Sequence, residues 1–237
     1  MRSAIILTAA LTLLSACTTY SARPTVAAAG SLATPRPDQP LPRFTHVFVI
    51  VEENKSFAQV LDSANAPNLA RLAHEYGSAT AFYGEVHPSE ANYVALLGGD
   101  TFGIHDDDAF YCKPRDVDRF CRGAAAPGYP GHTLSARHLG QQLEDKGLSW
   151  KGYYGDLPEP GSLSVVAGQL SAGGVAHPAA LYASKHSGFL NFASVQSDPK
   201  RAERIVGFDQ LGRDLDSDQL PNPTESESRD RVGWGFW

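Results

Sequence analysis

Two short polar segments hold the residues whose types and spacing suit chemistry. Residues 52–55 read Glu-Glu-Asn-Lys and offer carboxylate and amide oxygens. Residues 87–92 place Ser89 directly after a proline and before an apolar segment with helical spacing. A serine there can cap the helix by accepting a hydrogen bond from a backbone N–H, or it can be a nucleophile beside the positive helix end, where a phosphate binds. The two positions are compatible, so both roles stay open for Ser89.

A predicted strand precedes residues 52–55 and positions them. Residues 44–51 form a nearly unbroken apolar run rich in β-branched residues, which is typical of a strand buried on both faces of a parallel sheet. Glu53 and Asn54 follow the end of that strand, and open α/β sheets bind ligands in the crevice beyond the strand ends. We therefore predict a central strand whose carboxyl end brings Glu53 and Ser89 together. The alternative is a solvated loop of charged residues.

Helical and strand patterns alternate further along the chain. Residues 66–77 and residues 133–146 each carry apolar side chains at helical intervals; the first range ends in Gly77, and Gly147 follows the second. A strand is predicted next, at residues 149–154. A helix followed by a strand is the order that a parallel α/β sheet requires, so the sequence predicts an α/β fold.

The first forty residues predict export. Residues 1–16 combine a short positive start, an apolar core too short to span a bilayer and small residues at the end, as in a secretory signal peptide. Cys17, directly after Leu-Ser-Ala, matches a bacterial lipobox; the alternative is a cysteine that happens to lie near an ordinary cleavage site. Residues 17–40 are typical of a flexible tether. We predict a lipid anchor at Cys17 that holds the protein to a membrane, on the periplasmic side of the cell envelope and at the outer membrane.

An irregular insertion over the site is predicted at residues 101–130, which are polar and rich in glycine and proline. Cys112 and Cys121 lie in it, and outside the cytoplasm we expect them to form a disulfide. A zinc site is disfavoured, because the spacing is not Cys-x-x-Cys and no histidine pair is near. Residues 106–108 are three aspartates without the glycine-turned loop of a calcium site, and we interpret them as a solvated acidic turn.

Composition narrows the class of protein. The net charge is −6, and the chain has no basic run, which excludes nucleic acid as the expected partner. The local signatures of serine esterases, zinc proteases and dinucleotide enzymes (Gly-x-Ser-x-Gly, His-Glu-x-x-His and Gly-x-Gly-x-x-Gly) are absent from the sequence.

Residues 49–57 (VIVEENKSF) together with residues 87–93 (HPSEANY) resemble the phosphoesterase family of bacterial and fungal acid phosphatases and phospholipases C, a branch of the alkaline phosphatase superfamily. The resemblance extends over residues 41–222. It implies an alkaline-phosphatase-like domain of three layers, with helices on both faces of the sheet. Ala91 stands where the family usually has proline.

The resemblance also implies roles for individual residues. Glu53 and Asn54 would bind a divalent metal ion, and Ser89 would be the nucleophile. Asn92 and His186 would contact the substrate; for His186 the alternative is a histidine hydrogen-bonded within a loop. The function expected is metal-dependent hydrolysis of a phosphate ester, as in acid phosphatases. The alternatives are a phospholipase C-type phosphodiesterase and a catalytically inactive, lipid-anchored binding module or remnant.

Residues 223–237 depart from the family pattern. They are polar and charged and then abruptly aromatic at a point where a buried strand is due, and we interpret them as an aberrant tail that cannot form a core strand. The family completes its metal site with Asp and His residues nearer its end, whereas Asp230 is the single such residue after Asn222. We expect a domain that is truncated and incomplete at its C-terminus by a change of reading frame, poorly stable and close to inactive.

Overall fold

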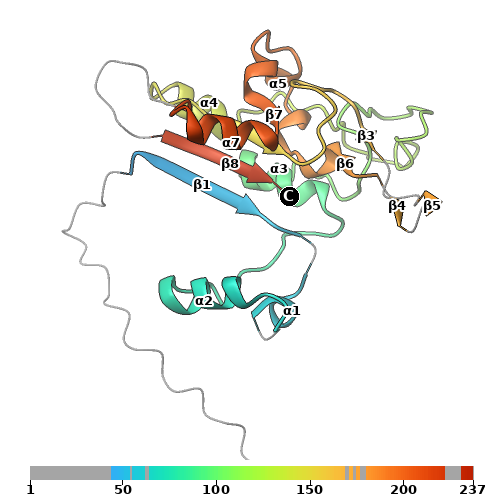
Figure 1. The fold of residues 1–237 in the computed structure, drawn as a ribbon. Helices are drawn as coiled ribbons and strands as arrows, with labels where there is room; N and C mark the ends of the chain where they lie inside the picture. The colour runs from blue at the N-terminus through green and yellow to red at the C-terminus, as the bar shows by residue number, and fades with distance from the viewer. Residues whose placement is uncertain are drawn as a thin grey trace, which may run out of the picture. The chain divides into compact units, whose positions relative to one another are not determined.

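The protein, described from a computed structural model, contains both helices and strands, and they form an α/β fold (Figure 1). The structure describes residues 44–53, 55–61, 64–168, 171–172, 175–176, 180–221 and 231–236. Their elements, in chain order, are β1 (His46–Val51), α1 (Phe57–Leu61), α2 (Pro67–Tyr76), α3 (Glu90–Gly98), α4 (Leu139–Glu144), β2 (Gly152–Tyr154), β3 (Val166–Ala167), β4 (Ser171–Ala172), β5 (Val175–Ala176), β6 (Tyr182–Ala183), η1 (Ser184–His186), η2 (Phe189–Asn191), α5 (Ala193–Gln196), α6 (Arg201–Arg204), β7 (Ile205–Gly207), α7 (Asp209–Asp216) and β8 (Arg231–Phe236).

Four strands make a parallel sheet in the order β1, β8, β2, β7. β1 pairs with β8 along its whole length, from His46 opposite Arg231 to Val51 opposite Phe236, and Figure 1 shows these two strands side by side. β2 pairs with both β8 and β7. β3 with β6 and β4 with β5 form two small antiparallel pairs. Parallel neighbours need crossover connections, and helices supply several of them here, so the predicted α/β class is confirmed.

β8 corrects the interpretation of the last residues. We expected residues 223–237 to be unable to form a core strand, but Arg231–Phe236 lies between β1 and β2 in the sheet. Its sequence alternates valine and aromatic residues with arginine and glycine, and β-branched and aromatic residues favour strands. Ladder hydrogen bonds use the backbone alone, so the two glycines do not prevent pairing. The segment before it, residues 222–230, lies outside the described residues.

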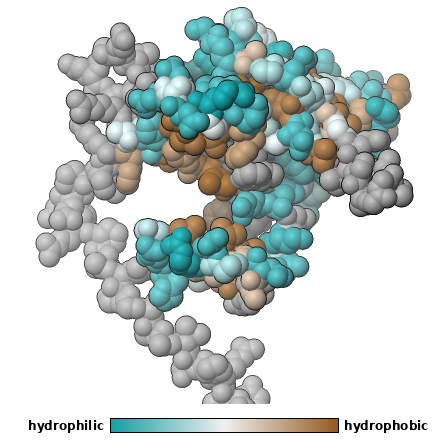
Figure 2. Space-filling view, viewed as in Figure 1, coloured by the Kyte–Doolittle hydropathy of each residue, from teal (hydrophilic) through white to brown (hydrophobic). Residues whose placement is uncertain are grey.

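β1 is an edge strand of the described sheet, and the prediction of a central strand buried on both faces is wrong for this structure. Val49 and Val51 pack against the core, whereas the side chain of Ile50 is 63% exposed and those of Val47 and Phe48 are also exposed. Figure 2 shows hydrophobic surface in this part of the molecule. An apolar run indicates a preference for burial, but it carries no information about which segments cover each face.

The predicted helices and the strand after them are present with shifted ends. α2 confirms the helix at residues 66–77, and Gly77 follows it with a φ of 111°, a value that favours glycine. α4 is shorter than the helix predicted at residues 133–146, because Leu134 instead forms a parallel bridge with Phe192. β2 likewise occupies the second half of its predicted range.

The core lies between α3, the strand β2 and the segment from η1 to β7. Trp150 stacks on Phe189 with ring centroids 4.2 Å apart, and both side chains are buried. Fully or almost fully buried around them are Val94, Leu97, Tyr154, Leu190, Phe192 and Ile205. This packing fixes the start of α3 and the η1 turn relative to each other, which places the candidate site.

The irregular insertion has its own small core. Cys112 and Cys121 form a disulfide, as predicted, with Cα atoms 5.5 Å apart. Both cysteines are buried with Ala109, Ala124 and Tyr129. In the part of the chain that the structure describes, no helix has the length and apolar character needed to cross a membrane.

Candidate active site

Three of the predicted site residues meet at the end of β1. The Ser89 hydroxyl donates a 2.8 Å hydrogen bond from Oγ to Oε1 of Glu53. The same Glu53 oxygen lies 3.2 Å from Nε2 of His186. Glu53 follows β1, Ser89 precedes α3, and His186 ends η1, so three segments far apart in sequence converge. Asn54, the other predicted metal ligand, and Cys17, the predicted lipid attachment site, lie outside the described residues.

Ser89 stands at the N-cap position of α3, but its hydroxyl does not cap the helix. The backbone N–H of Glu90 instead donates to Oδ1 of Asp107, at 3.1 Å. A carboxylate at this position satisfies one of the free N–H groups and suits the positive helix end. Because Asp107 does the capping, the Ser89 hydroxyl is left to Glu53.

Tyr93 and His186 complete the surroundings of Glu53. Burial and a hydrogen bond to Glu53 both raise the pKa of Tyr93, which therefore stays a neutral donor. Burial lowers the pKa of His186 and nearby Lys185 lowers it further, although Glu53 acts in the opposite direction. The rings of Tyr93 and His186 lie 5.5 Å apart. Tyr93 therefore holds the Glu53 carboxylate beside the Ser89 hydroxyl, and the His186 ring lies close to the same carboxylate.

Asn92 organises the loop that carries Ser89. Its Oδ1 accepts hydrogen bonds from the backbone N–H groups of Glu85 (2.7 Å) and Val86 (3.3 Å). Its Nδ2 donates to the carbonyl oxygens of Val86 (2.6 Å) and Pro88 (3.2 Å). These contacts use both ends of the amide on the backbone of the loop, which gives Asn92 a positioning role in this structure. Its contact with substrate stays a prediction.

Replacing Asn92 with alanine is therefore expected to lower the free energy of unfolding by about 2 kcal/mol, because several loop N–H and C=O groups lose their partner. Urea unfolding monitored by circular dichroism measures this change. Asn92→Asp keeps the acceptor for the two backbone N–H groups but places a carboxylate oxygen against two carbonyl oxygens, so it should also lower the free energy of unfolding. An unfolding midpoint unchanged in Asn92→Ala would show that the loop holds without the side chain.

The three aspartates at residues 106–108 are not the solvated turn that we expected. Oδ2 of Asp107 lies 2.6 Å from Nζ of Lys185, while its other oxygen holds the Glu90 amide. Asp108 is buried, and its carboxylate accepts two backbone hydrogen bonds and one from a tyrosine hydroxyl. The misinterpretation arose because the sequence does not show which partners the fold brings to these carboxylates.

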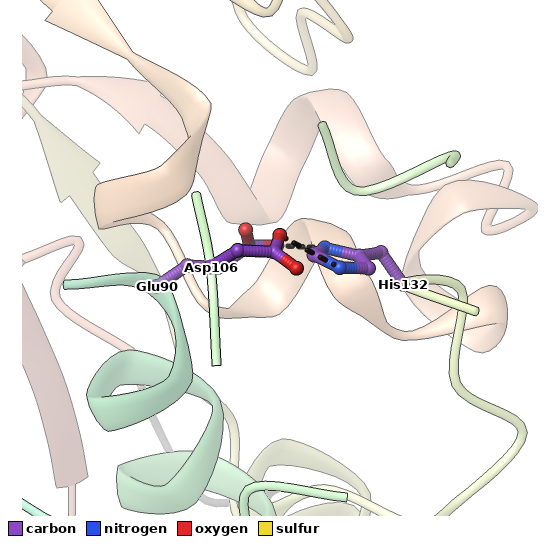
Figure 3. A group of neighbouring side chains, drawn as sticks. All are labelled: Glu90, Asp106 and His132. Carbon is purple, nitrogen blue, oxygen red and sulfur yellow. Dashed lines mark hydrogen bonds and ion pairs between the residues drawn. The ribbon is translucent and has the colours of Figure 1, made fainter. Parts of the chain in front are cut away.

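A second polar group lies on the buried side of the start of α3. Figure 3 shows the carboxylates of Glu90 and Asp106 beside the ring of His132. His132 Nδ1 lies 3.1 Å from Glu90 Oε1, and His132 Nε2 lies 3.2 Å from Asp106 Oδ1. One ligand atom from each of the three residues falls within 4.8 Å of the others, which makes this group able to hold a metal ion. We call it the Glu90 group.

Sequence reasoning missed the Glu90 group together with Tyr93 and Asp107. One signal was present, because Glu90 is a carboxylate that begins an otherwise apolar helix. A charged residue at such a position must find a partner when the helix is buried. The identity of that partner could not be found from spacing, since His132 is 42 residues away.

Comparison with known proteins identifies the family to which this chain belongs. Residues 59–224 match the phosphoesterase family, so this chain belongs to the phosphoesterase family. It is 33% identical over 155 residues to a phosphatidylinositol-3-phosphatase of Mycobacterium tuberculosis, covering 65% of this chain and 41% of that protein. It is 26% identical over 178 residues to a probable acid phosphatase of Kluyveromyces lactis, covering 75% of this chain and 36% of that protein. It is 28% identical over 178 residues to an acid phosphatase of Aspergillus fumigatus, covering 75% of this chain and 34% of that protein.

The matched region thus spans well under half the length of these curated relatives. No solved structure matches this chain.

Proposed function

We propose, against the near inactivity expected from the sequence, that this chain hydrolyses phosphate esters in the manner of an acid phosphatase, with Ser89 as the nucleophile and a divalent metal ion as cofactor. The observation that supports it most is the 2.8 Å hydrogen bond from Ser89 Oγ to Glu53, at the end of β1. A nucleophilic serine needs an adjacent group that takes its proton or a metal that lowers the cost of ionisation. Membership of the phosphoesterase family and relatives named as phosphatases point to the same chemistry.

The donor atoms present suit a divalent cation. Glu53 offers a carboxylate oxygen and Ser89 a hydroxyl oxygen on adjacent positions, and oxygen ligands are those that hard divalent cations prefer. Asn54 would add an amide oxygen. When bound, the cation would favour ionisation of the serine hydroxyl and neutralise charge on the phosphoryl oxygens.

The protein groups then act in two steps. Ser89 Oγ attacks phosphorus, its proton passes to Glu53 Oε1, and the bond from phosphorus to the ester oxygen breaks while that oxygen takes a proton from solvent. A water molecule next attacks phosphorus and releases a proton, the Oγ–phosphorus bond breaks, and Ser89 regains its proton from Glu53. Tyr93 keeps the Glu53 carboxylate oriented through both steps. Positioning of this kind accounts for much of the catalysis of phosphoryl transfer.

Turnover of an aryl phosphate tests the proposal. The chain should release the phenol from an aryl phosphate monoester after addition of a divalent metal, and a chelator should stop the reaction. Faster turnover of an aryl phosphodiester would favour the phospholipase C-type alternative. Binding of inorganic phosphate without turnover of either ester would overturn the enzyme and leave the lipid-anchored binding module. The substrate class is set by pocket contacts, so both esters must be compared.

Two further proposals concern the setting of the site. The parallel sheet and its crossover helices support a three-layer arrangement like that of alkaline phosphatases, which a structure of a longer homologue would check. The lipobox sequence supports a lipid anchor at Cys17 and a place at the periplasmic face of a membrane. Mass spectrometry of the mature N-terminus would find a diacylated cysteine; an unmodified N-terminus at another residue would contradict it.

A further inference from the structure

The ring of His132 is fully buried and has a carboxylate at each nitrogen. A neutral imidazole carries one N–H, so it can donate to one of the two carboxylates and leaves the other beside a nitrogen without a proton. Two arrangements satisfy both carboxylates. Either the ring is protonated and donates on both sides, or a cation lies among the nitrogen and the carboxylates.

Hydrogen-bond direction separates these two arrangements. Asp106 Oδ1 lies 3.2 Å from Nε2 of His132, but Nε2 makes no hydrogen bond to any described group. The oxygen is close to this nitrogen without being in the direction in which the nitrogen would donate. Two ligands of one metal show this relationship, since bonds of about 2.1 Å place the donor atoms roughly 3 Å apart while both point at the ion.

Two buried oxygens support the same conclusion. Glu90 Oε2 and Asn191 Oδ1 are inaccessible and have no hydrogen-bond partner among the described residues. Asn191 touches the group directly, because its Nδ2 donates to Glu90 Oε1 at 2.5 Å and to the His132 carbonyl at 3.1 Å. Both oxygens are acceptors, and leaving such atoms buried without a partner is costly. Protonation of His132 supplies neither of them with a donor, whereas a cation bound by the Glu90 group would interact favourably with Glu90 Oε2.

We propose that the Glu90 group is a second metal site, which binds a divalent cation of the zinc class through Glu90, Asp106 and His132. One imidazole nitrogen and two carboxylates suit zinc and related transition metals, whereas calcium and magnesium take oxygen ligands throughout. Asn191 holds the Glu90 carboxylate from outside, as partners of ligands commonly do in metal sites.

This site is distinct from the cation proposed at Glu53 and Ser89. The Glu90 carboxylate faces His132 in the interior, whereas the Ser89 hydroxyl faces Glu53. Glu53 does not belong to the group of ligand atoms that lie within 4.8 Å of one another. A cation here would join the first turn of α3 to Asp106 of the irregular insertion and to His132, which follows the insertion. Its role is to fix the segment that carries the nucleophile.

Metal content tests the proposal on the full chain, without reference to turnover. The Glu53→Gln chain, which weakens the other site, is stripped with a chelator, exposed to zinc chloride, desalted and analysed by mass spectrometry for metals. It should retain about one zinc ion per chain. Adding His132→Gln should remove that ion, and adding Asp106→Asn, at a side chain that is only partly buried, should weaken binding at least about tenfold. His74→Gln, at an exposed histidine of α2, is the matched control and should leave the content unchanged.

Circular dichroism establishes that each variant is folded. The second site would be overturned if the folded Glu53→Gln chain retained no zinc. It would also be overturned if adding His132→Gln or Asp106→Asn left the zinc affinity of that chain unchanged. The group would then be a histidine between two carboxylates without a metal. The proposed hydrolysis can fail independently of this result, because zinc content is measured in a chain that need not turn over any ester.

Discussion

Replacing Ser89 with alanine is expected to lower kcat for aryl phosphate hydrolysis by at least about three orders of magnitude, the scale at which nucleophile substitutions act. The reason is specific to the structure. The Ser89 hydroxyl is held by Glu53 at 2.8 Å and does not cap α3, so alanine removes the attacking oxygen without removing a cap. The free energy of unfolding should change little.

Steady-state kinetics of three variants makes this prediction sharp. Glu53→Gln keeps an oxygen beside Ser89 but loses the charge, so kcat should fall strongly and the metal concentration required for activity should rise. Ser197→Ala, at an exposed serine whose hydroxyl donates to the carbonyl of Ala193, should behave like the unchanged protein. Full activity in Ser89→Ala would mean that water attacks the ester directly, and the covalent route would be abandoned.

The convergence of Ser89 and Glu53 could be predicted because both positions are defined by local sequence. One follows an apolar strand and the other precedes an apolar helix, and α/β folds bring such ends together. The helix α2 and the strand β2 were found by the same local rules. A disulfide between Cys112 and Cys121 followed from the parity of the cysteines.

The rest depends on contacts between distant residues. Glu90 bonds to His132 and Asn191, which are 42 and 101 residues away, and no periodicity encodes such pairs. The exposure of β1 and the position of β8 between β1 and β2 likewise depend on the pairing and packing of the whole sheet. Tertiary context determines whether a short glycine-containing segment forms a strand, and intrinsic preference is a weak guide there.

His138 illustrates a buried group whose effect is on stability. Its ring is 2% exposed and lies 5.0 to 5.6 Å from the rings of Trp150, Phe189 and Phe192. Burial lowers the pKa of His138 from 6.5 to about 4, and the positive charges of Arg204 and Arg137 act in the same direction. Above pH 6.5 the ring is neutral in the folded and the unfolded chain, and it adds no pH dependence. Between pH 6.5 and 4 the unfolded chain binds a proton that the folded chain does not.

The free energy of unfolding should therefore fall by about 3 kcal/mol as the pH decreases from 6.5 to 4, on account of this one group. Other groups also change the free energy of unfolding with pH, in both directions. The carboxylates around His132, for example, raise its pKa against the effect of burial, so His132 makes the free energy of unfolding rise as the pH falls.

The difference between the unchanged protein and His138→Leu isolates the contribution of His138, because leucine packs against the same aromatic rings and cannot take a proton. Urea unfolding at a series of pH values should show a difference that is constant above pH 6.5 and moves by about 3 kcal/mol in favour of the variant toward pH 4. Parallel curves for the two proteins across this range would mean that His138 is protonated as readily in the folded chain as in the unfolded one.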